Sequence, residues 1–419
     1  MGNEKKYGFA TQVIHAAQEP EDWHGATVPP LFQSAAHVHA TAESLSDTFA
    51  GKKKDHIYSR LSNPTNAILE KKMTLLENGA GAVVMSSGMA AVTNACMALL
   101  RAGDEFIAGG SLFMSTYLLF TNVFKKYDIT VKLVPTNTLS EIEKNITDKT
   151  RFVYLETIGN PGMEVSNLKD IAELAHNYGL PLLVDNTLAT PYLCQPIDLG
   201  ADVVIHSTTK FLSGHGNAPG GVVIDSGNFE WNNERFPDFK PFIERKGELA
   251  FLDKVWREHH INFGTSQAPF HSFLTLTGLN TFAIRMERHL ENTMKVAEFL
   301  RDRPEVVWVN YPGFEDHPSH RIADIQFNWK GFGAMLTFGL KDQDACFKLI
   351  NNLKLIYHLA NLGDCKTLII HPWSSQYVAF DEDVKKGLGI KPELIRLSVG
   401  IEDIDDILDD LGQALENSV

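Results

Sequence analysis

Four short apolar runs, each followed directly by polar side chains, constrain the fold of this chain more than any other feature. The runs span residues 82–85, 152–155, 182–184 and 203–205, with helical patterns between them that are clearest over 89–100 and 168–178. Strands that alternate with helices predict a mostly parallel sheet covered by helices on both faces. Because such sheets bind ligands beyond the carboxyl ends of their strands, the four polar segments are expected to form one site.

Periodicity divides the 419 residues into three regions. Residues 1–64 are irregular and are expected to form an extended arm. Residues 65–265 hold the alternation of strands and helices, which a further strand over 221–224 continues. Residues 266–419 begin with one long helical pattern from Phe270 to Leu300 and then mix short strands with helices. The sequence therefore predicts an arm, an α/β domain and a smaller C-terminal α+β domain.

Charge and composition exclude several classes of protein. The net charge is −14 and the single lysine cluster, at 52–54, is short, so nucleic acid and anionic membrane surfaces are disfavoured as partners. No apolar run is long enough to span a bilayer, and the charged N-terminus is not followed by the apolar core of a secretion signal. The four cysteines lie far apart, which predicts neither disulfides nor a metal site and favours a cytoplasmic protein.

Three of the polar segments hold side chains that suit a cofactor. Ser87, Gly88 and Met89 open a predicted helix, whose free amides and dipole suit a phosphate, with an ordinary helix cap as the alternative. Asp185 ends an apolar strand, where a buried carboxylate is either a helix cap or the partner of a cation such as a protonated ring nitrogen. Lys210 is either a solvated surface lysine or a partly desolvated amine, which can lose its proton and form a Schiff base.

Together these groups match one cofactor. The hydroxyls of Ser207 and Thr209 add phosphate ligands directly before Lys210. A lysine for an imine, an aspartate for a pyridinium nitrogen and a phosphate cradle describe pyridoxal 5′-phosphate. The glycine-rich loops of nucleotide sites are absent from the sequence, as is the G-x-S-x-G turn of many hydrolases. A class I aldolase would also need the lysine, but it would have no use for the phosphate ligands or for Asp185.

These segments also carry a family resemblance, which extends over nearly the whole chain. Its motifs are Tyr58-Ser59-Arg60, Asn63-Pro64-Thr65, Ser86 to Ala90, Glu156 to Pro161, Asp185-Asn186-Thr187, His206 to Lys210 and Arg396 to Glu402. In this series the sequence resembles the Cys/Met-metabolism family of pyridoxal-phosphate enzymes, which implies fold type I with a mostly parallel seven-stranded sheet. The segments His215 to Gly221, Arg285 to His289 and Asn361 to Asp364 resemble its O-acetylhomoserine sulfhydrylase branch.

The resemblance implies a role for each matching residue. Lys210 would form the Schiff base and move protons, Asp185 would pair with the pyridine nitrogen, and Phe113 would stack on the ring. Arg396 would clamp the substrate α-carboxylate, with Thr367 beside it. Further cofactor contacts are implied for Asn160 at the ring oxygen, for Ser87, Gly88, Met89, Ser207 and Thr209 at the phosphate, and for Tyr58 and Arg60 from the arm of a neighbouring subunit. Tyr58 would also approach the substrate, and a homotetramer built from two dimers is implied.

Three positions depart from the family pattern. Phe113 stands where relatives carry a tyrosine, so that stacking is kept and a hydroxyl is lost. Thr367 stands where a serine is usual. Trp373 and Tyr377 replace a small residue and a histidine of the sulfhydrylases, which predicts a narrowed or reshaped entrance for the sulfur donor.

For the reaction, the resemblance implies a transferase of methionine biosynthesis that acts on O-acetylhomoserine or another O-acylhomoserine. A sulfur nucleophile would replace the acyloxy group at Cγ to give homocysteine or a relative. Sulfide, a thiol and a sulfur-carrying protein are all open as donors. Acetate leaves without a proton, which agrees with the phenylalanine at 113. Methionine γ-lyase, whose reactive cysteine corresponds to Ser115 here, is the second hypothesis, and cystathionine γ-synthase or lyase is the third. A pyridoxal-phosphate-binding protein without turnover is the alternative from a different class.

Overall fold

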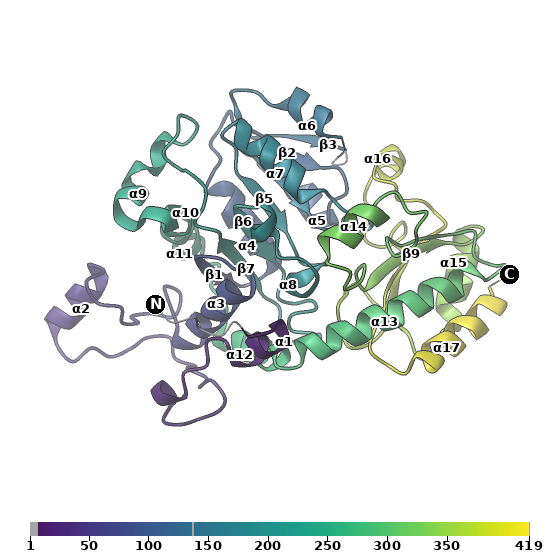
Figure 1. Cartoon of the computed structure of the whole chain (residues 1–419), viewed down its shortest axis with the longest axis horizontal. Helices are drawn as coiled ribbons and strands as arrows, with labels where there is room; N and C mark the ends of the chain where they lie inside the picture. Colours follow the sequence, from purple (N-terminus) through teal and green to yellow (C-terminus); the bar gives the residue numbers. More distant parts are fainter. Residues whose placement is uncertain (1–6, 136–137, 419) are drawn as a thin grey trace.

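A seven-stranded sheet forms the centre of the larger part of the protein, which we describe from a computed structural model covering residues 7–135 and 138–418 (Figure 1). Its strand order is β1-β7-β6-β5-β4-β2-β3, and only β7 runs antiparallel to its neighbours. The strands are β1 (Gly81–Met85), β2 (Glu105–Gly109), β3 (Thr130–Val134), β4 (Thr150–Glu156), β5 (Leu182–Asp185), β6 (Val203–His206) and β7 (Gly221–Asp225). The predicted fold class is confirmed.

The antiparallel direction of β7 agrees with the absence of a crossover helix between β6 and β7. Residues 207–220 connect the two strands without a helix. A parallel neighbour is usually reached through a crossover helix, whereas an antiparallel neighbour can follow a simple loop. The loop that turns the chain back holds Lys210, which therefore lies at the carboxyl end of β6.

Both faces of the sheet are buried, as the apolar runs predicted. In β4, Val153 and Leu155 pack on the face covered by α3 (Pro64–Leu76) and α7 (Leu168–Asn177), whereas Phe152 and Tyr154 pack on the face covered by α4 (Gly88–Met97). Alternate side chains of a strand point to opposite faces, so a strand that is apolar at every position is buried on both sides. Helices on both faces therefore hold the carboxyl ends of the strands in fixed positions.

A second sheet forms the core of the C-terminal part. Its order is β10-β11-β12-β9-β8, with β8 (Trp308–Asn310), β9 (Met335–Gly339), β10 (Tyr357–His358), β11 (Leu368–Ile370) and β12 (Leu394–Ser398). The helices α13 (Phe282–Arg301), α15 (Gln343–Asn352) and α17 (Ile404–Glu416) pack against it. Figure 1 shows α13 running from the larger part of the molecule into this smaller part.

The single long helix expected from Phe270 to Leu300 is instead two helices. The first, α12, spans Pro269–Leu279, and α13 begins at Phe282. Between them, the hydroxyl of Thr281 donates to the Gly278 carbonyl and accepts from the Arg285 guanidinium. Such local side-chain bonds compete with the helical ladder, and they explain a break that the hydrophobic period does not reveal.

The other helices lie in the arm and around the two sheets. They are α1 (Phe9–His15), α2 (Ala42–Phe49), α5 (Met114–Leu118), α6 (Leu139–Asn145), α8 (Thr190–Leu193), α9 (Lys240–Lys246), α10 (Ala250–Lys254), α11 (Ile261–Phe263), α14 (His320–Gln326) and α16 (Glu382–Gly387). Among the described helices, none combines the length and the apolar composition needed to cross a membrane.

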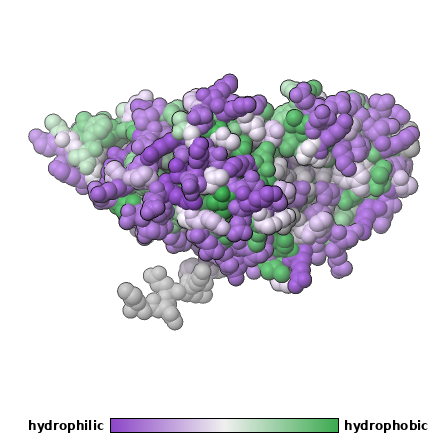
Figure 2. All heavy atoms as spheres, turned by 90° about the horizontal axis from the view of Figure 1, so that it is seen from above, coloured by the Kyte–Doolittle hydropathy of each residue, from purple (hydrophilic) through white to green (hydrophobic). Residues whose placement is uncertain are grey.

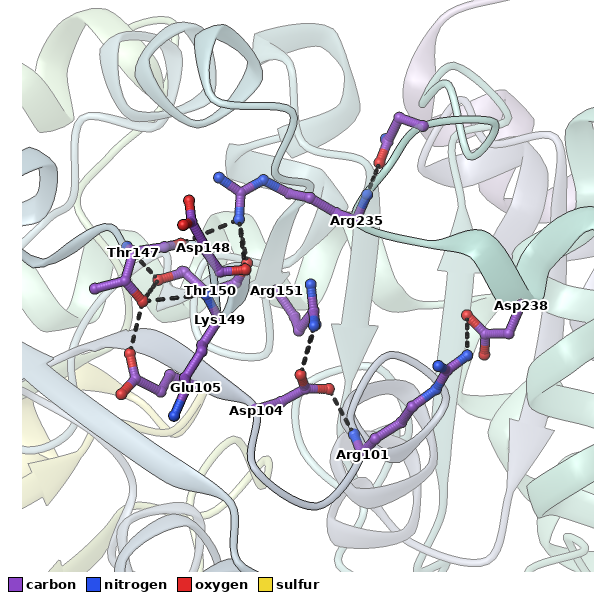
Figure 3. Close-up of polar contacts among 11 residues, drawn as sticks. Arg101, Asp104, Glu105, Thr147, Asp148, Lys149, Thr150, Arg151, Arg235 and Asp238 are labelled. Carbon is purple, nitrogen blue, oxygen red and sulfur yellow. Dashed lines mark hydrogen bonds and ion pairs between the residues drawn. The ribbon is translucent and has the colours of Figure 1, made fainter.

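Ion pairs and carbonyl contacts fasten one further segment to the start of the strands (Figure 3). Arg101 pairs with Asp238 at 2.7 Å, and Arg235 donates to the carbonyl of Thr150 at 2.8 Å. Asp238 and Arg235 belong to residues 226–263, which connect β7 to the region before α12. This network lies where β2 and β4 begin, so it secures the end of the sheet opposite to the polar strand ends.

Candidate active site

The carboxyl ends of β1, β4, β5 and β6 surround one cavity of about 290 Å³. Strand β12 of the second sheet and the loop between β10 and β11 complete its wall. Ten of the residues predicted for the site line the cavity: Ser87, Gly88, Met89, Phe113, Asn160, Asp185, Ser207, Thr209, Lys210 and Arg396. The polar strand ends singled out in the sequence therefore meet, as expected for a sheet of this class.

The start of α4 forms an anion-binding cradle. Ser87 caps the helix by accepting a bond from the Ala90 amide at 3.1 Å, whereas the amides of Gly88 and Met89, in the first turn, have no acceptor within the helix. A Cβ at Gly88 would lie only 2.6 Å from Cβ of Ser207, so glycine allows the end of β6 to approach the helix. Free amides, the helix dipole and the Ser207 hydroxyl suit a phosphate.

Asp185 ends β5 with its carboxylate in the cavity wall. Its Oδ1 accepts the Thr187 amide at 3.0 Å, and the Tyr154 hydroxyl lies 3.5 Å from Oδ2. Burial raises the pKa of Asp185, while the bonds from Thr187 and the charge of His206 act in the opposite direction. A cation in the cavity would hold this partly buried carboxyl ionised, which is the environment that a pyridinium nitrogen requires.

Lys210 places its amine inside the cavity. Nζ donates to Oδ1 of Asn361 at 2.5 Å. Burial, together with the nearby Arg396 guanidinium, lowers the pKa of Lys210 to about 8. The amine is therefore available as a neutral nucleophile or base near neutral pH.

In the cofactor-free protein, covalent attachment of added pyridoxal phosphate to Lys210 should accelerate through a midpoint near pH 8. Lowering the pKa of an amine increases its neutral fraction at every pH, so Lys210 reacts about two pH units below an exposed lysine. Initial rates, measured by borohydride trapping and mass spectrometry from about pH 6 to about pH 10, check this expectation. A midpoint near that of an ordinary exposed lysine would contradict it.

Arg396 is a buried cation without a carboxylate partner among the described residues. The side chain, 3% exposed, donates to Oδ1 of Asn160 and to the carbonyl of Asn361, both at 3.1 Å. Burial lowers the pKa of Arg396 to about 10. An unpaired buried guanidinium is costly, and a ligand carboxylate is the group that its fork matches.

Two residues of the cavity had no role in the sequence analysis. Glu156 lines the cavity, and its Oε1 accepts the Phe113 amide at 2.6 Å, which fixes the loop that carries the aromatic ring. Burial, and secondarily the charge of Asp185, raises the pKa of Glu156. Asn361 contacts both Lys210 and Arg396. Each lay within a quoted motif, but a single polar residue in a loop carries no spacing that would assign such a contact.

Three residues predicted for the site do not line this cavity. Tyr58 is 44% exposed, and the Arg60 guanidinium lies 5.6 Å from the centre of its ring while bonding the Ile261 carbonyl. Thr367 is fully buried, and its hydroxyl donates to Glu402 at 2.9 Å. The chain's own Tyr58 and Arg60 thus lie outside the cavity, and the hydroxyl of Thr367 is occupied by another side chain.

The positions expected to reshape the entrance lie in the loop after β11. Gln376 of this loop lines the cavity, and its neighbour Tyr377 is 2% exposed. Trp373 lies under the Lys385 ammonium, 4.5 Å from the ring centre. Tyr377 lies near two residues of the cavity wall, Glu156 and Arg396, whereas Trp373 packs against Lys385 and does not line the cavity. The narrowed entrance for the sulfur donor stays a prediction.

Comparison with known proteins assigns the family. Residues 10–416 match the profile of the Cys/Met metabolism PLP-dependent enzymes. The chain belongs to this family. The cofactor of the protein is therefore pyridoxal 5′-phosphate, and the protein is a PLP-dependent enzyme, as the sequence predicted.

Individual relatives cover almost the full length. The chain is 40% identical to the homocysteine synthase of Schizosaccharomyces pombe, over 97% of this chain and 98% of that protein. It is 39% identical to the L-methionine gamma-lyase of Fusobacterium nucleatum subsp. polymorphum, over 98% and 99%. A crystal structure named as an O-acetylhomoserine (thiol)-lyase from Campylobacter jejuni, which contains an N′-pyridoxyl-lysine-5′-monophosphate, superposes with a TM-score of 0.92 at 30% identity, over 98% and 100%.

The residues present fit the family's cofactor. Pyridoxal phosphate needs an amine for its aldehyde, an anion for its ring nitrogen and donors for its phosphate. The cavity provides Lys210, Asp185 and the α4 cradle, with the ring of Phe113 among the lining side chains. The close approach at Gly88, where a Cβ would meet Ser207, is the local feature most specific to the phosphate end.

Proposed function

We propose that this enzyme replaces the acyloxy group of O-acetylhomoserine, or of another O-acylhomoserine, by a sulfur nucleophile to give homocysteine in methionine biosynthesis. The observation that carries the proposal is the pairing of Lys210 and Arg396 through Asn361, whose Oδ1 accepts from the lysine and whose carbonyl accepts from the arginine. An amine-reactive lysine beside a carboxylate-binding arginine suits the two ends of an α-amino acid. Relatives named homocysteine synthase and O-acetyl-L-homoserine sulfhydrylase support this choice of amino acid.

Each side chain then has a defined task. Arg396 binds the substrate carboxylate in a bidentate fork and orients Cα toward Lys210. Lys210 Nζ removes the proton at Cα and transfers it toward the cofactor. Asp185 holds a proton on the ring nitrogen. The cofactor, when bound, supplies an electron sink for the charge left at Cα.

Phe113 favours a leaving group that departs without a proton. A phenyl ring offers a stacking face but no acid, and acetate is a stable anion. A thiolate leaving group, as in methionine cleavage, would benefit from an acid at this place. The 39% identity to a methionine gamma-lyase nevertheless makes γ-elimination the second candidate.

The deciding experiment supplies the purified, cofactor-loaded enzyme with O-acetylhomoserine and sulfide. Homocysteine and acetate are the expected products. Ammonia and 2-oxobutyrate from methionine would assign the protein to the lyases, and absence of turnover with O-acetylhomoserine, O-succinylhomoserine, methionine and cystathionine would refute the proposal. Methanethiol and cysteine in place of sulfide then define the sulfur donor, and the acyl series defines the leaving group.

We further propose that residues 1–64 form an arm that carries Tyr58 and Arg60 to the cofactor phosphate of a neighbouring subunit, in a homotetramer of two dimers. The position of both residues outside their own chain's cavity supports this assignment. The arm also exposes apolar side chains at Val38, Leu45 and Phe49, and Figure 2 shows hydrophobic atoms at the end of the molecule from which α2 projects. We place the enzyme in the cytoplasm, with domains that meet near residue 265.

Arg60→Ala should weaken cofactor binding at least about tenfold, because a charged bond to phosphate is lost. Mixing this variant with Lys210→Ala should restore up to about a quarter of wild-type activity, since half of randomly mixed dimers combine one intact lysine with one intact arginine across the interface. Activity and size-exclusion profiles after co-refolding check this. If mixing restores nothing, Arg60 does not act on a neighbouring subunit.

A further inference from the structure

We propose that Glu77 is a positioning residue of this active site, which fixes the strand ends that bear Asp185 and Lys210 and holds the imidazole of His206 behind Asp185. The inference rests on the cofactor site of the proposed function. It is tested by cofactor affinity, so it does not depend on which amino acid the enzyme transforms.

Glu77 follows α3 and is completely buried on the face of the sheet opposite to Asp185. Its Oε1 lies 2.6 Å from Nε2 of His206 and 2.9 Å from Nδ2 of Asn186. All three side chains are 0% exposed. His206 is the last residue of β6, and Asn186 directly follows the last residue of β5. One carboxylate oxygen therefore joins the ends of the two strands that deliver the acid and the amine of the site.

Asn186 extends the same network to a third strand end. Its Oδ1 accepts the hydroxyl of Thr157 at 2.8 Å, and its Nδ2 also donates to the Cys194 carbonyl at 2.9 Å. Thr157 directly follows Glu156, the last residue of β4 and a lining residue of the cavity. The carboxyl ends of β4, β5 and β6 are thus fastened to one another from beneath, on the face covered by α3.

The side-chain alternation of the strands places the network behind the site and outside the cavity. Asp185 pairs in register with Ile205, so Asn186 and His206 lie on the opposite face of the sheet from Asp185. Val184 and Val204 share that face with Leu76 at the end of α3. Glu77 therefore acts on the reacting groups through His206 and Asn186, without touching the cofactor.

A buried carboxylate–imidazole pair at this place contributes little to stability by itself. Oε2 of Glu77 and Nδ1 of His206 are buried and have no hydrogen-bond partner among the described residues. Incompletely bonded buried ion pairs are commonly no more stable than apolar replacements. The bond does, however, hold the imidazole of His206 near Asp185, and the charge of that ring opposes the effect of burial on the pKa of Asp185.

Other titratable groups face the pair and Asp185. Cys194, whose backbone contacts Asn186, has a thiol pKa raised by burial and by the charge of Glu77. Tyr154 faces Asp185 from β4, with a pKa raised by burial and by Asp185 itself. Glu156 also lies near Asp185, and its pKa is raised by burial and by the charge of Asp185. The thiol of Cys194 and the hydroxyl of Tyr154 therefore stay neutral around neutral pH.

The test compares Glu77→Gln with the wild type by measuring the dissociation constant of pyridoxal phosphate as a function of pH. Glutamine keeps an oxygen acceptor for His206 and Asn186 but removes the negative charge that faces the imidazole. The charge of His206 lowers the pKa of Asp185, so a weaker charge there lets Asp185 gain its proton at a higher pH and lose its attraction for the ring nitrogen. The acid limb, where affinity falls as pH falls, should therefore move up by at least about 0.5 pH unit.

Glu70→Gln is the matched control. Glu70 lies on the same helix and accepts the Val84 amide of β1 at 3.0 Å, but it contacts none of the strand ends joined by Glu77. This variant should leave the acid limb where it is in the wild type, whatever its melting temperature. His206→Gln provides a second variant and should shift the limb in the same direction as Glu77→Gln. If both site variants change only the melting temperature of the cofactor-free protein, the positioning role is refuted.

Discussion

Lys210→Ala should lower turnover at least about 1,000-fold and abolish covalent attachment of the cofactor. Lys210 is the only amine among the residues that line the cavity, and Asn361 fixes its Nζ at 2.5 Å. A positioned general base alone contributes about 10²- to 10⁴-fold, and the loss of the covalent link adds to this effect. Turnover with O-acetylhomoserine and sulfide measures the first loss. Mass spectrometry after borohydride reduction measures the second.

Lys125→Ala is the control for this experiment. Lys125 is exposed and is not among the residues that line the cavity, so its loss should change neither attachment nor turnover. Cofactor covalently bound to the Lys210→Ala protein at another lysine would contradict the assignment. Exogenous methylamine offers a further check, because a small amine that enters the cavity can partly replace the missing base.

Arg396→Ala should lower kcat/KM about 100- to 1,000-fold, mainly through KM for the amino acid. Removing one partner of a buried charge pair costs about 2–5 kcal/mol, or about 30- to 5,000-fold, and the expected loss lies within this range. Arg396→Lys keeps the charge but loses the fork, so it should recover only part of the loss. Steady-state kinetics with O-acetylhomoserine at saturating sulfide measure both variants, and cofactor absorbance verifies that both remain loaded.

Arg321→Ala, an exposed position in α14, is the comparison for charge alone and should behave as the wild type. A normal KM in Arg396→Ala would show that another group binds the carboxylate. Arg396 also bonds Asn160 and Asn361, so its loss can disturb β12 locally. A Glu393→Gln variant changes a residue next to the same strand and is the control for such a disturbance.

The large sheet and most of its site were accessible from the sequence because the relevant signals are local. Apolar runs such as 182–184 report burial on both faces, and the polar residue that follows each run marks the carboxyl end of a strand. Asp185 and Lys210 could be placed in one site by this argument alone. The parallel order of the strands then brings together residues that are far apart in sequence.

The contacts that sequence reasoning missed depend on long-range packing. Asn361 bonds a lysine 151 residues away, and Glu77 bonds a histidine 129 residues away. Neither residue carries a periodic or spaced signal, because a single polar side chain in a loop or after a helix is ordinary. The helix break at Thr281 was not predicted for a different reason. The hydrophobic periodicity of the sequence continues across such a short interruption.

The two hydrogen bonds made by Asn361 have a consequence for how the enzyme selects its amino-acid substrate. Lys210 follows β6 of the large sheet, whereas Arg396 lies in β12 of the small one, and Asn361 bonds both side chains. The distance between Lys210 Nζ and the Arg396 guanidinium therefore depends on how the larger and the smaller part of the protein pack against each other. Any change that tilts one half will appear as altered discrimination between amino acids of different backbone geometry, even when every residue around the ring is untouched.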